Sequence, residues 1–154
     1  MPQLMTMKII AIGLIAGVMT FTGVMVVMNL GEEAQAEPFL LYLGIAFAPI
    51  AVVASFIAQN AVGQKMVEEF LHQNKDVRAG DDKFTDWMLA AYQTKMIVGM
   101  CILEGVCLFN AICYAVDGNW VSLGVIAGLL VFMAMQFPSE TSVNQWLEVQ
   151  EQKV

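Results

Sequence analysis

The sequence predicts an all-α membrane protein: a polytopic four-helix bundle with two short interfacial helices on its cytoplasmic side. Its 154 residues are 58% hydrophobic and only 14% charged, whereas soluble domains are about 45–50% apolar and about 25% charged. The apolar residues gather in four blocks, each close to the roughly 20 helical residues that cross a bilayer. The basic residues all lie outside these blocks. We therefore expect one transmembrane domain over residues 1–154.

The first two predicted spans cover residues 9–30 and 39–58. The first is apolar throughout and is longer than the core of a secretory signal, which has about 7–15 residues. We therefore expect it to be retained, although Ala34-Gln35-Ala36 after it could be read as a cleavage site. The second contains Pro49, which removes one backbone donor and is expected to kink the helix.

The third and fourth predicted spans cover residues 96–116 and 120–137. The third contains all three cysteines, Cys101, Cys107 and Cys113. A spacing of six residues turns each cysteine by about 240° around a helix, so the three thiols point to different sides. Within one helix they can form neither a disulfide framework nor a metal site, and we interpret them as packing residues.

The basic residues predict the orientation of the chain in the membrane. They lie before the first span, between or beside the second and third spans, and in the tail: Lys8, Lys65, Lys75, Arg78, Lys83, Lys95 and Lys153. The connections 31–38 and 117–119 contain no Lys or Arg. By the positive-inside rule, both termini and the 59–95 connection are cytoplasmic. We expect the protein to lie in the cell inner (plasma) membrane.

The cytoplasmic segments carry helical patterns of their own. Residues 59–73 continue the second helix with a polar pattern, and residues 83–93 and the tail 138–154 have apolar residues at helical spacing. These residues are Phe84, Trp87, Met88 and Ala91 in one segment and Val143, Trp146 and Leu147 in the other. The two segments are typical of interfacial helices with a tryptophan at headgroup level. The alternative is that these faces pack on each other.

Several function classes are disfavoured by composition. The net charge is −7 with only seven basic residues, which argues against a nucleic-acid partner. The sequence contains no phosphate-binding loop, no nucleophile beside a base and no metal-ligand cluster, so we predict no enzyme activity, no cofactor and no metal. The expected partners are the lipid bilayer and either a homo-oligomer or a larger membrane complex. Gly13-x-x-x-Gly17 and Gly124-x-x-x-Gly128 have the spacing for close helix contacts.

One carboxylate stands apart from the other acidic residues. Thirteen of the fourteen acidic residues fall in loops or tails, but Glu104 is the ninth residue of the third span. A charge at that depth costs on the order of 2.5–3.5 kcal/mol, and such residues are commonly proton or ion sites. Burial in an apolar medium favours the neutral, protonated form. The alternative is a protonated Glu104 that hydrogen-bonds to a neighbouring helix and holds the helices together.

Helical spacing suggests what surrounds Glu104. The predicted supporting groove consists of residues on or beside its face: Cys101, Gly105, Cys107 and Leu108. The candidate hydrogen-bond partners in other spans are Thr20, Thr22, Ser55 and Ser122, of which the first three suit the depth better. Asn110 lies about 120° around the helix from Glu104, so we expect it to join a different helix contact.

The third span resembles the ion-carrying helix of the c subunit of rotary ATP synthases. The likeness covers residues 94–109, Thr94-Lys-Met-Ile-Val-Gly-Met-Cys-Ile-Leu-Glu104-Gly105-Val-Cys-Leu108-Phe109. In that family, small residues lead to an ion-carrying Glu followed by Gly or Ala, then by aliphatic and aromatic residues. The resemblance implies that Glu104 carries an ion, and Gly105 in place of a hydroxyl residue implies a proton rather than sodium. The rest of the chain does not match the family.

Three functions follow as hypotheses, of which the third is an accessory of a membrane-embedded enzyme. The first is a small membrane protein in which the mid-membrane carboxyl of Glu104 takes part in proton or ion translocation. The second is a non-catalytic structural or scaffolding subunit of a membrane protein complex, in which Glu104 stabilises helix packing.

Overall fold

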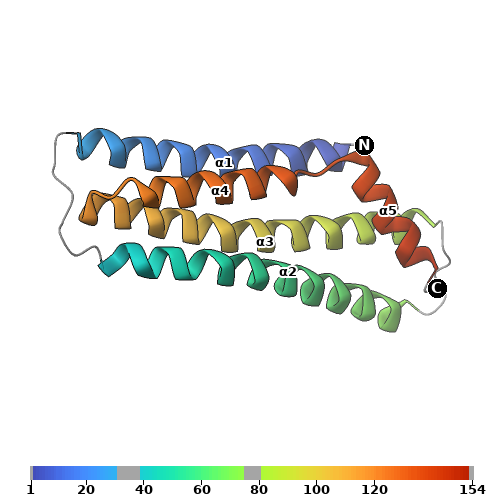
Figure 1. Cartoon of the computed structure of the whole chain (residues 1–154). Coiled ribbons are helices and arrows are strands. Elements are labelled where there is room, and N and C mark those ends of the chain that lie inside the picture. The colour runs from blue at the N-terminus through green and yellow to red at the C-terminus, as the bar shows by residue number, and fades with distance from the viewer. Residues whose placement is uncertain (1, 31–38, 75–80, 153–154) are drawn as a thin grey trace.

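The computed structural model describes residues 2–30, 39–74 and 81–152, and these residues form an all-α fold, as predicted. The structure contains five helices: α1 (Pro2–Met28), α2 (Phe39–Gln73), α3 (Asp82–Asp117), α4 (Val121–Met135) and α5 (Glu140–Glu151). The first four lie side by side, and α5 crosses one end of them (Figure 1). The helices α1 and α3 run in the same direction, and α2 and α4 run in the opposite one.

Three of the helices, α1, α2 and α3, are long and apolar enough to cross a membrane. The fourth helix, α4, has 15 residues and is only about 22 Å long, less than the roughly 30 Å of a hydrocarbon core. It passes the same test only together with α5, which is bent from it by 61°. The bend coincides with Pro138, which lacks a backbone donor and disfavours helix at Phe137.

The 59–95 connection is mostly helix that continues the flanking spans. Residues 59–73 belong to α2, as expected, and residues 83–93 are the first part of α3 rather than a separate helix. No glycine or proline lies between Asp82 and Val98, so nothing in the local sequence stops the helix before the apolar stretch. Residues 75–80, which connect α2 to α3 in the sequence, lie outside the described residues.

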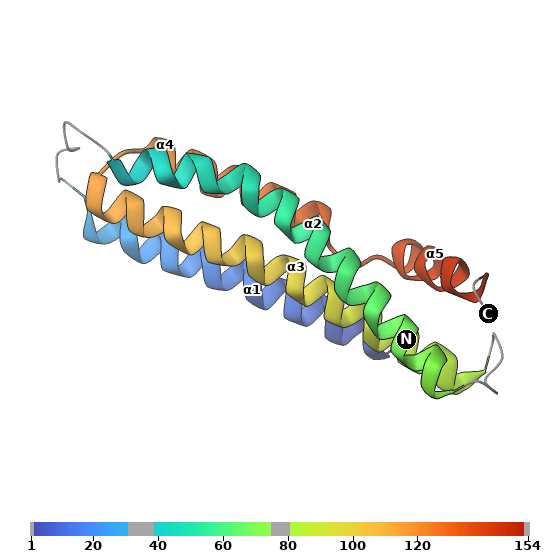
Figure 2. The same cartoon turned by 90° about the horizontal axis from the view of Figure 1, so that it is seen from below.

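The helix α3 is the centre of the fold, because it packs against all four other helices. The helices α1 and α2 lie on either side of it (Figure 1), and Figure 2 shows α1 and α3 together with α2 and α4 above them. The core follows α3 through Met100, Leu103, Cys107 and Ala111, all fully buried. Residues from α1 and α4 complete it, among them Met7, Ala11, Val18, Ile126 and Met133.

A second apolar cluster joins the hydrophilic ends of α2 and α3. It consists of Val67, Phe70, Phe84 and Met88, and the rings of Phe70 and Trp87 stack with centroids 5.3 Å apart. Trp146 and Leu147 of α5 pack against the same cluster. The faces that the sequence assigns to the membrane surface therefore pack on one another, which was the alternative interpretation.

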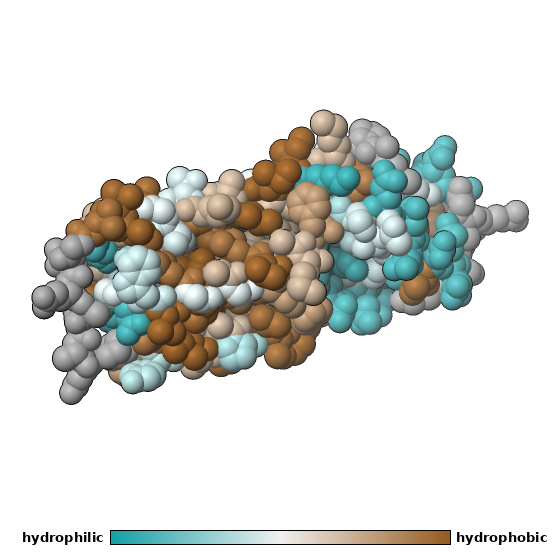
Figure 3. All heavy atoms as spheres, turned by 45° about the horizontal axis from the view of Figure 1, so that its top comes forward, coloured by the Kyte–Doolittle hydropathy of each residue, from teal (hydrophilic) through white to brown (hydrophobic). Residues whose placement is uncertain are grey.

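The outer surface has the character of a membrane protein. Large apolar side chains are exposed along α1 and α2, for example Ile9, Val27, Tyr42 and Ile50, each at least 60% exposed. A soluble protein rarely exposes so much contiguous apolar surface. In Figure 3, hydrophobic residues cover most of the visible face, and hydrophilic residues gather at the end where α5 lies. Both the start of α1 and α5 lie at that end (Figure 1).

Candidate functional site

Glu104 lies on the side of α3 that faces α1. Its side chain is partly buried, and its Oε1 atom is 3.5 Å from the position that a Cβ atom on Gly17 would occupy. Because α1 and α3 are parallel, Gly17 and Glu104 meet near the middle of their apolar stretches. Gly17 therefore lies beside the carboxyl at ordinary van der Waals distance.

No hydrogen bond or ion pair joins Glu104 to another described residue, and the four hydroxyls expected as its partners are used differently. The Ser55 hydroxyl donates to the carbonyl of Val52 in its own helix, at 2.8 Å. The hydroxyls of Thr22 and Ser122 are buried without a partner in the described chain, and Thr20 is exposed. The expected hydrogen bond inside the bundle is therefore not formed.

The four residues of the predicted groove differ in how far they are buried. Cys101 and Gly105 are exposed, Leu108 is partly buried and Cys107 is fully buried. Cys107 follows Glu104 by three residues and lies about 60° from it around α3. It belongs to the hydrophobic core, to which α1 and α4 also contribute residues. We define the Glu104 seam as Glu104 together with small exposed residues that lie within about one helical turn of it or of Gly17: Gly13, Gly17, Cys101 and Gly105.

Asn110 forms the contact with a different helix that the sequence predicts. It is fully buried, and its Nδ2 atom donates to the carbonyl oxygens of Val106 at 2.9 Å and of Gly44 at 3.4 Å. A Cβ atom on Gly44 would overlap Asn110 Oδ1. This glycine therefore lets α2 approach α3 closely enough for the amide to reach its backbone. Asn110 Oδ1 is buried and has no partner among the described residues.

Asp117 is a buried polar residue whose role the sequence did not reveal. It is the last residue of α3, only 3% exposed, and its Oδ2 atom accepts a hydrogen bond from the backbone N–H of Leu41 at 2.8 Å. The first amides of a helix have no partner within the helix, so Asp117 caps α2 from a neighbouring helix. The predicted topology could have pointed to this contact, because it places the end of the third span and the start of the second on the same side of the membrane.

A polar layer lies at the opposite end of the apolar region. The Nε2 atom of Gln59 donates to Oε1 of Gln136 at 2.8 Å, which links α2 to α4. The Gln59 side chain lies against Gly99, where a Cβ atom would overlap it. Lys95, one turn earlier, places its ammonium group 3.7 Å from the centre of a Trp146 ring. This layer joins α2, α3, α4 and α5 where the hydrophobic surface ends.

No protein-family model, curated protein or solved structure matches this chain. The likeness of residues 94–109 to the helix of the rotary c subunit therefore stays a prediction. Chemically, the site offers one carboxyl near the middle of the apolar stretch of α3, beside small residues. Such a group can exchange a proton or hydrogen-bond to a polar group from outside the chain.

Proposed function

We propose that this chain is a multi-pass membrane protein in which Glu104 binds and releases a proton within the bilayer and so takes part in proton movement. In this proposal α1, α2 and α3 cross the membrane, α4 with the bend into α5 supplies a fourth span, and both termini are cytoplasmic. The protein acts in the cell inner membrane as an oligomer or as part of a larger complex.

The observation that carries the proposal is the open position of the Glu104 carboxyl. A carboxyl that only holds helices together would be expected to hydrogen-bond inside the bundle. Glu104 has no such bond to the described residues, although Thr22 and Ser122 carry unpaired hydroxyls in the same bundle. Its place between Gly17 and the exposed Gly105 leaves it accessible from the surface that faces lipid.

The chemistry of this position favours proton binding over binding of a metal cation. Groups of three or more His, Cys, Asp or Glu side chains that could hold a metal are absent from the described residues. A carboxylate in apolar surroundings costs on the order of 2.5–3.5 kcal/mol, and binding a proton removes this charge. A proton is then released when a partner or a water molecule reaches the carboxyl.

The proposal can be tested by reconstitution of the purified protein into lipid vesicles. We expect proton flux, followed with a pH-sensitive dye under an imposed potential, and modification of Glu104 by a hydrophobic carbodiimide, which reacts with protonated carboxyls. The Glu104→Gln variant should lose both, because the amide takes the same volume but cannot release a proton. Mass spectrometry identifies the modified residue.

Asp117→Asn is the matched control, since Asp117 is a second buried carboxyl of α3 that lies at the end of the helix. It should keep both the flux and the carbodiimide modification of Glu104. Absence of flux together with absence of modification at neutral pH would contradict the proposal. Modification without flux would exclude translocation and would favour the structural role described next.

A structural or scaffolding subunit is the second candidate, and it is favoured by how the chain uses its other buried polar groups. Asn110, Asp117 and Gln59 each link two helices. A Glu104 that lacks such a link within the chain would then hydrogen-bond to a helix of a neighbouring subunit. This candidate predicts that Glu104→Gln preserves assembly with that subunit, because an amide can both donate and accept.

A further inference from the structure

The Glu104 seam differs from the rest of the surface that faces lipid. Gly13, Gly17, Cys101 and Gly105 are all exposed, and a Cβ atom on Gly13 or Gly105 would meet nothing within 4 Å. The backbones of α1 and α3 therefore lie open over about one turn of each helix. Small residues in this arrangement allow the backbone of another helix to approach closely.

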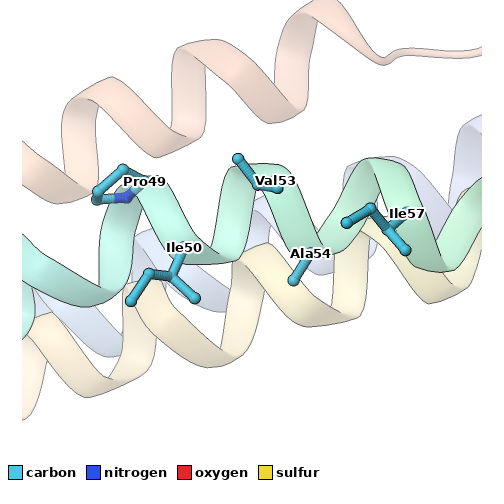
Figure 4. Close-up of a pocket in the computed structure, with 5 residues that line it drawn as sticks. All are labelled: Pro49, Ile50, Val53, Ala54 and Ile57. Carbon is cyan, nitrogen blue, oxygen red and sulfur yellow. The ribbon is translucent and has the colours of Figure 1, made fainter.

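The outer face of α2 provides a contrast. A hollow of about 450 Å³ lies there, lined by Pro49, Ile50, Val53, Ala54 and Ile57, which follow one another along α2 in Figure 4. Every one of these side chains is apolar, and the hollow suits a lipid acyl chain. The seam, in contrast, contains a carboxyl, and an acyl chain offers no hydrogen-bond partner to a carboxyl.

The group that covers the seam must therefore carry a hydrogen-bonding atom at the depth of Glu104. No basic residue of this chain lies in the apolar segments, and Lys95 is about two and a half helical turns away along α3. Insertion orients every copy of the chain in the same way. Rotation about the membrane normal brings the same residue of two copies to the same depth, so a second copy presents its own Glu104.

We propose that a second copy of this chain covers the Glu104 seam, with the two Glu104 carboxyls hydrogen-bonded to each other across a two-fold axis along the membrane normal. A protonated carboxyl donates through its O–H, and either a neutral or an ionised carboxyl accepts. Two-fold dimers are also the commonest symmetric assemblies. This inference rests on the proposed function and names the partner of its proton-binding group.

Cys101 provides a test without introduced labels, because it is an exposed cysteine on the seam, whereas Cys107 and Cys113 are buried. The purified chain is reconstituted at low protein density and oxidised with copper–phenanthroline. We expect a disulfide-linked dimer on a non-reducing gel, since equivalent positions beside a two-fold axis can reach the Cα separation of about 5.5–6 Å that a disulfide needs. The dimer should be lost in Cys101→Ala and kept in the Cys107→Ala/Cys113→Ala variant.

The matched control moves the thiol to the outer face of α2. Ile50→Cys in the Cys101→Ala background is equally accessible to the oxidant, because Ile50 is 60% exposed. This variant should form no disulfide-linked dimer on the non-reducing gel. A dimer yield equal to that of the wild type would indicate random collision and would overturn the proposal. So would a wild-type chain that stays monomeric, or a Cys101 that forms its disulfide with a different protein when native membranes are oxidised.

The contribution of the carboxyl is tested by two variants of Glu104. Glu104→Gln keeps a donor and an acceptor and should keep the dimer, whereas Glu104→Leu should lose it. Unchanged helical circular dichroism verifies that both variants fold. An undiminished dimer in Glu104→Leu overturns the carboxyl pair. Proton flux and crosslinking are read separately: a crosslinked dimer without flux contradicts only the proposed function, and flux without a crosslink contradicts only the dimer.

Discussion

Polar side chains in the apolar part of this chain fall into two groups by their hydrogen bonds. Asn110 and Asp117 are buried and each binds the backbone of α2. Glu104 is only partly buried and binds no described residue. In a bilayer, an unpaired polar group costs several kcal/mol, so the first two residues stabilise the monomer. Glu104 is the carboxyl of this region whose partner must be a proton, water or a group of another chain.

The contact between Gly44 and Asn110 leads to a prediction about stability. Gly44→Ala should destabilise the protein by about 1–3 kcal/mol, the usual cost of overpacking, because the new Cβ atom would overlap Asn110 Oδ1. Unfolding in mixed micelles, followed by circular dichroism, measures the change. Adding Asn110→Ala should recover part of the loss, since it removes the overlapping group.

Gly124→Ala is the control for this comparison, because a Cβ atom on Gly124 would meet nothing within 4 Å. It should leave the stability of the protein unchanged. Unfolding of Gly44→Ala and Gly124→Ala at the same denaturant concentration would contradict the close contact between α2 and α3 at Gly44.

Among the helices, α5 is held by a contact between a cation and an aromatic ring. The Lys95 ammonium lies 3.7 Å from a Trp146 ring centroid and 4.8 Å from that of Tyr92. Both the Lys95 stem and Trp146 lie against Gly63 of α2, and Val143 of α5 is fully buried. The helix therefore packs firmly across the hydrophilic end of the bundle, although Pro138 turns it away from α4.

Replacing the cation should loosen α5. Lys95→Met keeps most of the side-chain length but removes the charge, and we expect a loss of about 0.5–2 kcal/mol for the contact with the ring. Digestion by a protease that cleaves after Glu140 and Glu148 should become faster in this variant. Lys83→Met is the control, because Lys83 is exposed. Equal digestion rates of the two variants would contradict stabilisation of α5 by the contact between Lys95 and Trp146.

For the whole molecule, the arrangement of the helices makes the predicted orientation testable. The start of α1, the end of α2 and α5 lie at one end, and the turn between α3 and α4 lies at the other (Figure 1). In a chain without its native cysteines, Trp120→Cys should react with an impermeant maleimide in intact cells, because Trp120 is 67% exposed. Lys65→Cys should react only after lysis. The reverse pattern would overturn the positive-inside assignment.

Features that depend on local sequence could be predicted without the structure. Hydropathy and length are properties of consecutive residues, so the all-α class and three helices long enough for a membrane were predicted correctly, whereas the predicted fourth span passes this test only together with α5. The depth of Glu104 along its helix also follows from counting residues. The separation of Asn110 from Glu104 follows from the helical repeat, and Asn110 does contact a different helix.

Features that depend on contacts between distant residues were decided only by the tertiary structure. The sequence could not show that residues 83–93 pack on α2, that Asp117 caps α2, or that Cys107 faces the interior, because each depends on how α3 is rotated against its neighbours. The same rotation places Glu104 beside Gly17, without a hydrogen bond to the hydroxyls expected to bind it. The sequence by itself determined that one carboxyl lies near the middle of an apolar helix, because position along a helix follows from counting residues. Helix packing decided that this carboxyl is left without a hydrogen-bond partner inside the described chain, because partners come from other helices.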